Sequence, residues 1–361
     1  MTDSTLEAPG FPRDYSLKGP LNARAVELGL ANAQWYHTEI PRARMKELMK
    51  RSDGPATRDT ILWVGGMILT GALGAYFWGT WACVPFFAVY GVLYGSGGDS
   101  RWHECGHGTA FKTLWKNDLV YQLACFLMVR NPVVWRWSHS RHHTDTIIVG
   151  RDPEIVAMRP PDIFRLVANF FGIFDFPEAL LKTLRYSFGQ LDEEERDFIP
   201  AMEQGKVFAI ARLWIAIYAF TVLLALYFHS FLPLMLVGLP RMYGAWHHVL
   251  TGVTQHVGLA EDVLDHRMNC RTIYMNPFSR FIYWNMNYHV EHHMFPMVPY
   301  HALPELHKEI VNDCAKPYAS ILEAYAEILP TMRRQLKDPT YFVRRQLPPT
   351  ARPSSALVAA E

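Results

Sequence analysis

The sequence lacks the cysteine pattern of a disulfide framework or a thiolate metal site. Its five cysteines stand singly, with no CxxC pair and an odd total: Cys83, Cys105, Cys125, Cys270 and Cys314. Disulfide-stabilised modules, iron–sulfur proteins and thiolate-zinc modules use paired or regularly spaced cysteines. These classes are therefore excluded.

The sequence also lacks an excess of charge of either sign. Its 35 Lys and Arg residues nearly cancel 34 Asp and Glu residues, which leaves a formal net charge of +1. Nucleic-acid binding that rests on net charge is therefore disfavoured. The N-terminal region has no apolar core of the kind found in cleavable signal peptides. Because 50% of the 361 residues are hydrophobic, disorder across the whole chain is excluded too.

The hydrophobic residues are concentrated in two long zones. No charged residue occurs from Ile61 to Gly98. One membrane-spanning helix needs about 20 residues, so this zone predicts two spans, with a tight turn at Gly79 and Thr80. An alternative, buried helices of a soluble core, fits such long runs poorly.

A second apolar zone runs from Val207 to about Val249 and is again long enough for two spans. Its fixed charges are Arg212, which can snorkel to the surface, and Arg241, which lies deeper. The sequence therefore predicts an all-α integral membrane protein with four transmembrane helices in two hairpins.

Basic residues indicate the orientation of these spans. Neither hairpin connection carries Lys or Arg, whereas six basic residues precede the first hairpin: Arg42, Arg44, Lys46, Lys50, Arg51 and Arg58. Cytoplasmic loops are enriched in Lys and Arg. Both termini and the polar segments outside the two apolar zones are therefore expected in the cytoplasm, as for a bacterial inner-membrane protein.

The expected organisation follows from these boundaries. Residues 119–134 and 163–181 are too interrupted to span and are expected to lie along the inner leaflet. The predicted segments are a cytoplasmic N-terminal segment (1–58), a transmembrane hairpin (59–98), a cytoplasmic loop (99–206), a second transmembrane hairpin (207–250), a cytoplasmic cap (251–340) and a disordered tail (341–361).

Eight of the 16 histidines fall in three short boxes. The boxes read HECGH at 103–107, HSRHH at 139–143 and HVEHH at 289–293. On a helix, residues three and four apart share a face, so each box can aim two or three imidazoles at one point. Eight imidazoles exceed what one metal ion uses, which argues for two ions. Imidazole suits iron, copper, zinc and nickel, so the ligand type alone does not select the metal. The candidate ligands are His103, His107, His139, His142, His143, His289, His292 and His293.

Other classes of metal or haem protein fit the spacing less well. The boxes flank the apolar zones on one side, whereas a metal transporter would place ligands along a path within its spans. A bis-histidine haem protein needs facing histidines inside the spans, and residues 61–98 contain none. We take His37, His229, His266 and His307 to be ordinary surface or core histidines.

These boxes, in this order around two apolar pairs, resemble the integral-membrane fatty acid desaturase and hydroxylase superfamily. HECGHGTAF at 103–111 resembles the first box of plant-type acyl-lipid desaturases, HSRHHTD resembles their second, and YHVEHHMFPMVPYHAL at 288–303 resembles their third. The resemblance extends over about residues 59–306.

The resemblance implies a non-haem di-iron centre, held by a cytoplasmic helical domain, with a ninth histidine just after the fourth span. His256 in TGVTQHVG is the preferred match, and His247 and His248 are competitors. Asn285 either orients a ligand or metal-bound water or is an ordinary interfacial residue. Glu104 and Glu291, inside the boxes, are expected to accept hydrogen bonds from ligand imidazoles.

The implied reaction is O2-dependent desaturation of an acyl chain linked to a lipid, CoA or acyl carrier protein, with two Fe²⁺ ions as cofactor. Alternatives are a hydroxylase or other oxygenase on the same scaffold, or a desaturase of a small amino-acid-like metabolite. The chain has no haem-binding HPGG segment, CxxC pair or GxGxxG after a strand. A separate ferredoxin, rubredoxin or cytochrome b5-like protein with its reductase is therefore the expected electron donor.

Overall fold

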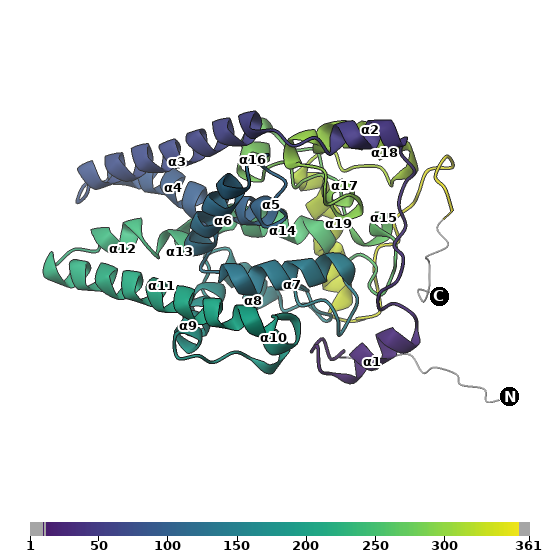
Figure 1. Ribbon diagram of the computed structural model, residues 1–361, viewed down its shortest axis with the longest axis horizontal. Helices are drawn as coiled ribbons and strands as arrows, with labels where there is room; N and C mark the ends of the chain where they lie inside the picture. The colour runs from purple at the N-terminus through teal and green to yellow at the C-terminus, as the bar shows by residue number, and fades with distance from the viewer. Residues whose placement is uncertain (1–9, 11, 354–361) are drawn as a thin grey trace.

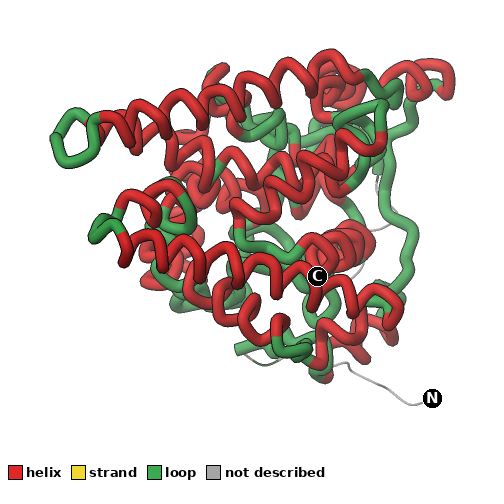
Figure 2. The backbone as a smooth tube through the Cα atoms, turned by 60° about the vertical axis from the view of Figure 1, so that its left-hand side comes forward, coloured by secondary structure: helices red, strands yellow, loops and turns green. Residues whose placement is uncertain are grey.

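All regular elements in the described part of the chain are helical. The computed structural model describes residue 10 and residues 12–353, where two isolated β-bridges accompany the helices (Figure 1, Figure 2). The all-α fold predicted from the sequence is confirmed at this level.

The apolar zones build one end of the molecule, drawn at the left of Figure 1. Its helices are α3 (Asp53–Tyr76), α4 (Cys83–Gly95), α11 (Ala201–Tyr227), α12 (Leu232–Leu236) and α13 (Pro240–Tyr243). The first two form the expected helical hairpin, which turns at Gly79 with φ +86°. Glycine adopts this left-handed backbone without steric cost, so the turn is well matched to its sequence.

The second apolar zone differs from the expected pair of long helices. One long helix, α11, is followed by three short ones, α12, α13 and α14 (Trp246–His256). Gly238 has φ +92°, and Pro240 begins α13. Because proline has no backbone N–H and a left-handed residue ends a helix, the returning segment is broken at these positions.

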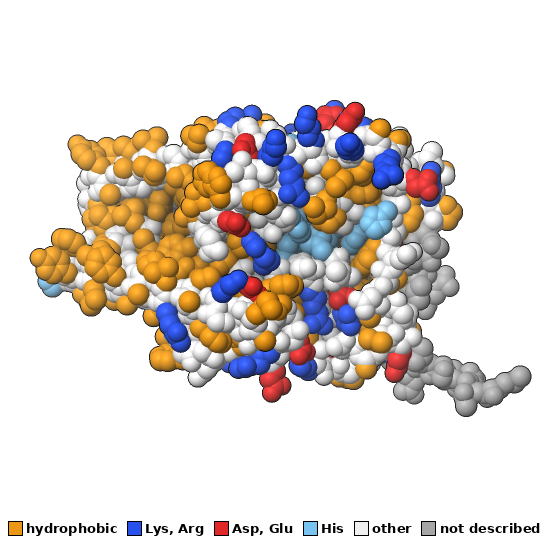
Figure 3. All heavy atoms as spheres, viewed as in Figure 1, with side chains coloured by type: hydrophobic (Ala, Val, Ile, Leu, Met, Phe, Trp, Pro, Cys, Tyr) orange, Lys and Arg blue, Asp and Glu red, His pale blue; other side chains and the backbone are white. Residues whose placement is uncertain are grey.

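Large apolar side chains cover the surface of this end (Figure 3). Ile68 on α3 and Leu223 on α11 have 68% and 61% of their surface exposed. An apolar surface of this extent is typical of contact with lipid. Among the described helices, α11 is the one whose length and apolarity suit a membrane span, and the four-span topology stays a prediction.

The backbone of α4 touches the end of α13 at glycines: Gly91 and Gly95 lie on α4, and Gly244 directly follows α13. A Cβ atom on Gly244 would lie 1.7 Å from the carbonyl oxygen of Gly91, and one on Gly95 would lie 2.5 Å from that of Pro240. The Ser96 hydroxyl also donates to the Gly244 carbonyl at 2.6 Å. This crossing fixes α13 against the start of the histidine-bearing region.

The remaining helices surround the histidine boxes at the other end of the molecule (Figure 1). They are α1 (Pro20–Glu27), α2 (Arg42–Leu48), α5 (Gly97–Gly106), α6 (Leu114–Met128), α7 (Pro132–Thr144), α8 (Ile163–Asn169), α9 (Asp175–Ser187), α10 (Glu193–Phe198), α14, α15 (His266–Asn269), α16 (Pro277–Ile282), α17 (His289–Met294), the 3₁₀ helix η1 (Tyr300–Ala302), α18 (Leu303–Ile310), the 3₁₀ helix η2 (Val311–Asp313) and α19 (Ile321–Gln335). The two segments expected along the leaflet fall on α6 with α7 and on α8 with α9. Both are interrupted by left-handed residues, Val129 and Gly172.

The predicted disorder of the tail is wrong for residues 341–353. The Val343 amide donates to the Gly258 carbonyl at 2.8 Å, and the Arg352 amide donates to the Asp313 carboxylate at 2.7 Å. These bonds hold the segment against the cap despite its prolines. Residues 354–361 lie outside the described part of the chain.

Candidate metal centre

Four helices bring the boxes to one place. The first box lies on α5, with His107 capping the C-terminal end of that helix. The second occupies the last turns of α7, which begins at Pro132 after the N-cap residue Asn131, and the third lies on α17. His256 ends α14. Each box is helical, as its spacing predicts, so the imidazoles of each point from one helix face.

The Nε2 atoms of one group of imidazoles face one another. His139 Nε2 lies 3.1 Å from His107 Nε2 and 3.1 Å from His143 Nε2. His292 Nε2 lies 3.1 Å from His143 Nε2. With one donor atom taken from each residue, five histidines lie within 4.8 Å of one another: His103, His107, His139, His143 and His292.

A second group lies beside the first. His289 Nε2 is 2.9 Å from His256 Nε2 and 3.0 Å from His293 Nε2. His142, His256 and His293 also have donor atoms within 4.8 Å of one another. All nine predicted histidines are thus brought together in two adjoining groups, which we call the histidine cluster. His247, in contrast, contacts the Ser279 hydroxyl, and neither it nor His248 belongs to either group.

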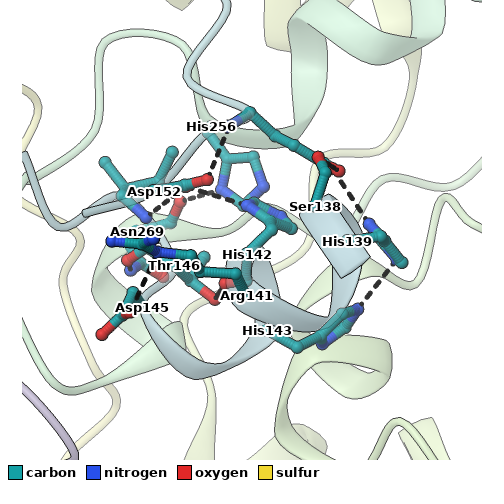
Figure 4. A network of polar contacts seen from close by, with 12 residues as sticks. Ser138, His139, Arg141, His142, His143, Asp145, Thr146, Asp152, His256 and Asn269 are labelled. Carbon is teal, nitrogen blue, oxygen red and sulfur yellow. Dashed lines mark hydrogen bonds and ion pairs between the residues drawn. The ribbon is translucent and has the colours of Figure 1, made fainter. Parts of the chain in front are cut away.

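Three cluster histidines are oriented through Nδ1 (Figure 4). His139 Nδ1 donates to the Glu154 carboxylate at 2.9 Å, and His142 Nδ1 donates to Asp152 at 2.8 Å. His256 Nδ1 lies 2.7 Å from the carbonyl oxygen of Asn269. A proton held on Nδ1 leaves the Nε2 lone pair free to bind a metal.

Burial keeps most of these imidazoles neutral. It lowers the pKa of His103, of His107 and of His256 to about 3. His142 is the exception: burial lowers its pKa, but the adjacent Asp152 carboxylate outweighs burial and raises it. Neutral imidazole is the form that binds metal ions.

The cluster fits a metal site better than a network of hydrogen bonds. Each Nε2 has one in-plane position for a proton or a lone pair, so His143 Nε2 cannot bond well to both His139 and His292. The buried Nδ1 atoms of His103, His143, His289 and His292 also have no hydrogen-bond partner. Cations shared by facing lone pairs would satisfy the Nε2 atoms, and imidazole suits iron among other metals.

The two box glutamates have different surroundings. Glu104 lies among ligands, with its carboxylate 3.5 Å from His292 Nδ1 and 3.8 Å from His103 Nδ1. Glu291 instead accepts from Thr272 and from His307 Nδ1, both at 2.5 Å. The expectation that Glu291 binds a ligand imidazole is therefore not met, and His307, taken as ordinary, is its partner.

Asn285 lies away from the imidazoles. Its side-chain amide donates to the Tyr300 carbonyl and accepts from Arg280, both at 3.0 Å. The residue has φ +56°, a conformation that asparagine tolerates well. These contacts hold a turn, and a role of Asn285 in orienting a ligand or a metal-bound water stays a prediction.

The hydrogen-bond acceptors outside the boxes were not predicted from the sequence. Asp152 and Glu154 belong to the segment RDPE, about ten residues after the second box, and Asn269 acts through its backbone. Two acidic residues shortly after a histidine box are the one feature of the sequence that could have indicated these acceptors. His266 was missed as well: it joins Cys270 and His293 in a third close group and stacks on Trp35 at 4.2 Å.

A cavity of about 930 Å³ adjoins the histidine cluster. Its wall includes His139, His142 and His256 together with Trp102 and Trp135. Side chains from the loop after α7 and from α14 also line it. A small molecule or part of an acyl chain can therefore lie directly beside the imidazoles.

Two comparisons with known proteins bear on this centre. A family model described as fatty acid desaturase matches residues 78–325, which contain all nine clustered histidines. An sn-1 oleoyl-lipid 12-desaturase of Synechocystis sp. is 30% identical to the chain over 88 residues. That match covers 23% of this chain and spans a quarter (25%) of the length of the Synechocystis protein.

Proposed function

The chain belongs to the fatty acid desaturase family, and on that premise we propose that it is an O2-dependent membrane desaturase that introduces a C=C bond into an acyl chain. The observation that carries the proposal is the convergence of nine imidazoles, from segments far apart in the sequence, in two adjoining groups.

The proposed cofactor is a pair of iron ions. The first would be held within the group that contains His103, His107, His139, His143 and His292, and the second by His142, His256, His289 and His293. Iron bound there supplies the oxidising power that removes hydrogen from an unactivated C–H bond with O2. Asp152 and Glu154 keep the Nδ1 protons of His142 and His139 in place, which directs both Nε2 lone pairs inward.

The cavity supplies positioning and exclusion of water. Trp102 lies against His103 and His139, with ring centroids 5.6 and 5.2 Å apart. Such an aromatic wall holds two adjacent substrate carbons beside the metal ligands and limits access of solvent. Desaturation needs this control because hydrogen must leave neighbouring carbons of one chain.

The proposed enzyme crosses the bilayer four times, with both termini and the histidine cluster in the cytoplasm. The exposed apolar surfaces of α3, α4 and α11, gathered at one end of the molecule, support this topology (Figure 3). The returning segment is then the broken run from α12 to α14, whose inner part packs against α4.

Electrons are proposed to come from a separate ferredoxin, rubredoxin or cytochrome b5-like protein with its reductase. Each desaturation consumes two electrons from outside in addition to the two taken from the substrate, and the reduction of O2 to water balances both pairs. The lack of an internal haem or dinucleotide motif in the sequence supports an external donor.

Co-expression with a ferredoxin and its reductase, followed by mass spectrometry of lipids and small metabolites, tests the proposal. We expect an O2-dependent product two mass units lighter than its precursor, which disappears in His142→Ala but not in His37→Ala, an exposed histidine outside the cluster. A product sixteen mass units heavier would indicate a hydroxylase instead. No O2-dependent product in either fraction would contradict the proposal.

A further inference from the structure

One buried arginine beside the cavity differs from the other buried arginines. Arg241 on α13 has 3% of its surface exposed, and its guanidinium donates one hydrogen bond, from Nε to the Met128 carbonyl at 3.3 Å. Its Nη1 is buried with no hydrogen-bond partner, and no ion pair to it is found among the described residues.

The other deeply buried arginines show what the fold normally provides. Arg101 donates to the carbonyl oxygens of Gly97, Phe281 and Ile282. Arg267 pairs with the carboxylates of Asp265 and Asp313. Burial of a guanidinium without such partners is unfavourable. The described residues supply no acceptor for Arg241 Nη1, so a bound molecule is the expected source of one.

Arg241 lines the cavity together with a second cation. Arg130 also forms part of the cavity wall, where its guanidinium stacks on Trp135 at 3.8 Å from the ring centroid. Its Nη1 lies 3.7 Å from the Asp99 carboxylate, too far for a good hydrogen bond. His248 lines the same part of the wall, and the charges of both arginines act on it.

The carboxylates near this pair of arginines are already engaged. Asp99 accepts from the Trp102 indole N–H at 3.1 Å, and Asp175 accepts from the Asn169 amide at 2.6 Å. The cavity therefore has one wall region with two cations, of which Arg241 has an unpartnered Nη1 and Arg130 pairs with Asp99 at 3.7 Å, and another region formed by the histidine cluster. We call the first region, made by Arg130, Arg241 and His248, the cationic wall.

We infer that the substrate carries an anionic group, a carboxylate or a phosphate, which binds Arg241 and Arg130 in the cationic wall while the reacting carbons lie beside the histidine cluster. This rests on the proposed function for the position of the reacting carbons. An acyl chain that placed only its methyl end in this cavity would leave Arg241 without an acceptor. The substrate class is thus a molecule with a free anionic terminus inside the protein.

Binding to the iron-loaded protein in nanodiscs, measured by calorimetry, tests the inference with three probes of equal chain length. The probes are octanoate, octyl phosphate and methyl octanoate. We expect octanoate or octyl phosphate to bind about 10- to 100-fold more tightly than the ester, as for a charge-assisted hydrogen bond formed out of water. The tighter anion identifies a carboxylic acid or a phospholipid-type phosphate. Equal affinities for all three probes would overturn the inference.

Substitutions of single arginines test which residues cause the preference for an anionic probe. Arg241→Gln and Arg130→Gln should each reduce the affinity for the preferred anion toward that of the ester. Arg212→Gln, an exposed arginine on α11 that donates to the Ser187 carbonyl, should leave it unchanged. An anion preference that persists in both cavity variants would contradict the inference. If Arg241→Gln does not fold, the inference is still tested by Arg130→Gln and by the affinities of the wild-type protein for octanoate and methyl octanoate.

Iron content separates this inference from the proposed function. Iron-loaded protein without an anion preference would overturn the cationic wall and leave the desaturase proposal intact. An anion preference in a protein that binds no iron would overturn the desaturase proposal instead.

Discussion

Carboxylates outside the boxes orient the imidazoles that the boxes provide. Asp152 accepts from His142 Nδ1 and from the Ile147 amide, and Glu154 accepts from His139 Nδ1 and from the Ser138 hydroxyl. Such partners fix the ring orientation of a ligand and raise its basicity. Their loss should weaken metal binding although no ligand is removed.

Asp152→Asn should lower the affinity for iron by about 10- to 100-fold, because the neutral amide no longer supports the imidazole beside it. Competition with a chelator of known affinity measures this. Asp197→Asn, an exposed carboxylate paired with Lys18, serves as the control. Equal iron affinity in Asp152→Asn and wild type would show that the contact is incidental.

His256→Ala should release iron, whereas His247→Ala should retain it. The two histidines lie on the same helix, but His256 Nε2 is 2.9 Å from His289 Nε2 and His247 contacts Ser279. Metal analysis of both purified variants distinguishes them. Iron loss in His247→Ala alone would reverse the assignment of the ninth ligand.

At the residue scale, helical spacing predicted which histidines share a helix face, and the structure brings these side chains together. The eight box histidines follow from i, i+3 and i+4 positions on helices, which the sequence prints directly. Asp152 and the carbonyl of Asn269 act from irregular segments, where no periodicity tells which atom faces the cluster. The pairing of Glu291 with His307 depends on how α17 packs against α18, which the sequence does not encode locally.

At the scale of elements, the crossing of α4 and α13 connects the apolar end to the cavity. Gly91 and Gly244 let the two backbones touch, and this contact places α13 with Arg241 beside the cavity. Close approach of this kind requires residues without Cβ atoms.

Gly244→Ala should destabilise the protein by about 1–3 kcal/mol or more, because the new Cβ would overlap the Gly91 carbonyl in a well-packed region. Thermal unfolding in detergent measures the change. Gly205→Ala on α11, where nothing lies within 4 Å of the new atom, should be neutral or stabilise by up to about 1 kcal/mol. Equal melting temperatures for both variants would contradict this role of the crossing.

The positions of the helices in the apolar zones were predictable, but the break of the segment after α11 into short helices was not. Absence of charge over residues 61–98 predicted the α3–α4 hairpin. Over 207–250 the length of the apolar zone predicted two long helices, although Gly238 and Pro240 break the second. The ordered segment 341–353 was mispredicted because its proline-rich composition says nothing of its bonds to Gly258 and Asp313.

At the scale of the whole molecule, the polar and apolar residues separate into two ends (Figure 3). The two predicted transmembrane hairpins, residues 59–98 and 207–250, contain three of the 69 charged residues (35 Lys and Arg plus 34 Asp and Glu): Asp59, Arg212 and Arg241. In the proposed topology, the hairpin tips lie outside the cytoplasm.

Thr80→Cys, at the exposed tip of the first hairpin, should react with a membrane-impermeant maleimide in intact cells. Asp197→Cys, exposed in the predicted cytoplasmic loop 99–206, should react only after permeabilisation. The five native cysteines are first replaced, and the wild-type topology is checked by retained iron. Labelling of Asp197→Cys in intact cells would contradict a cytoplasmic location of this loop.

The central claim is that the histidine cluster holds two iron ions, and the iron content of the purified protein tests it most directly. Elemental analysis against protein concentration should give two iron ions per chain in the wild type and a clear loss in His142→Ala, whose imidazole lies in the second ligand group. An unchanged iron content in His142→Ala, or a wild-type protein that binds no iron, would contradict the di-iron centre.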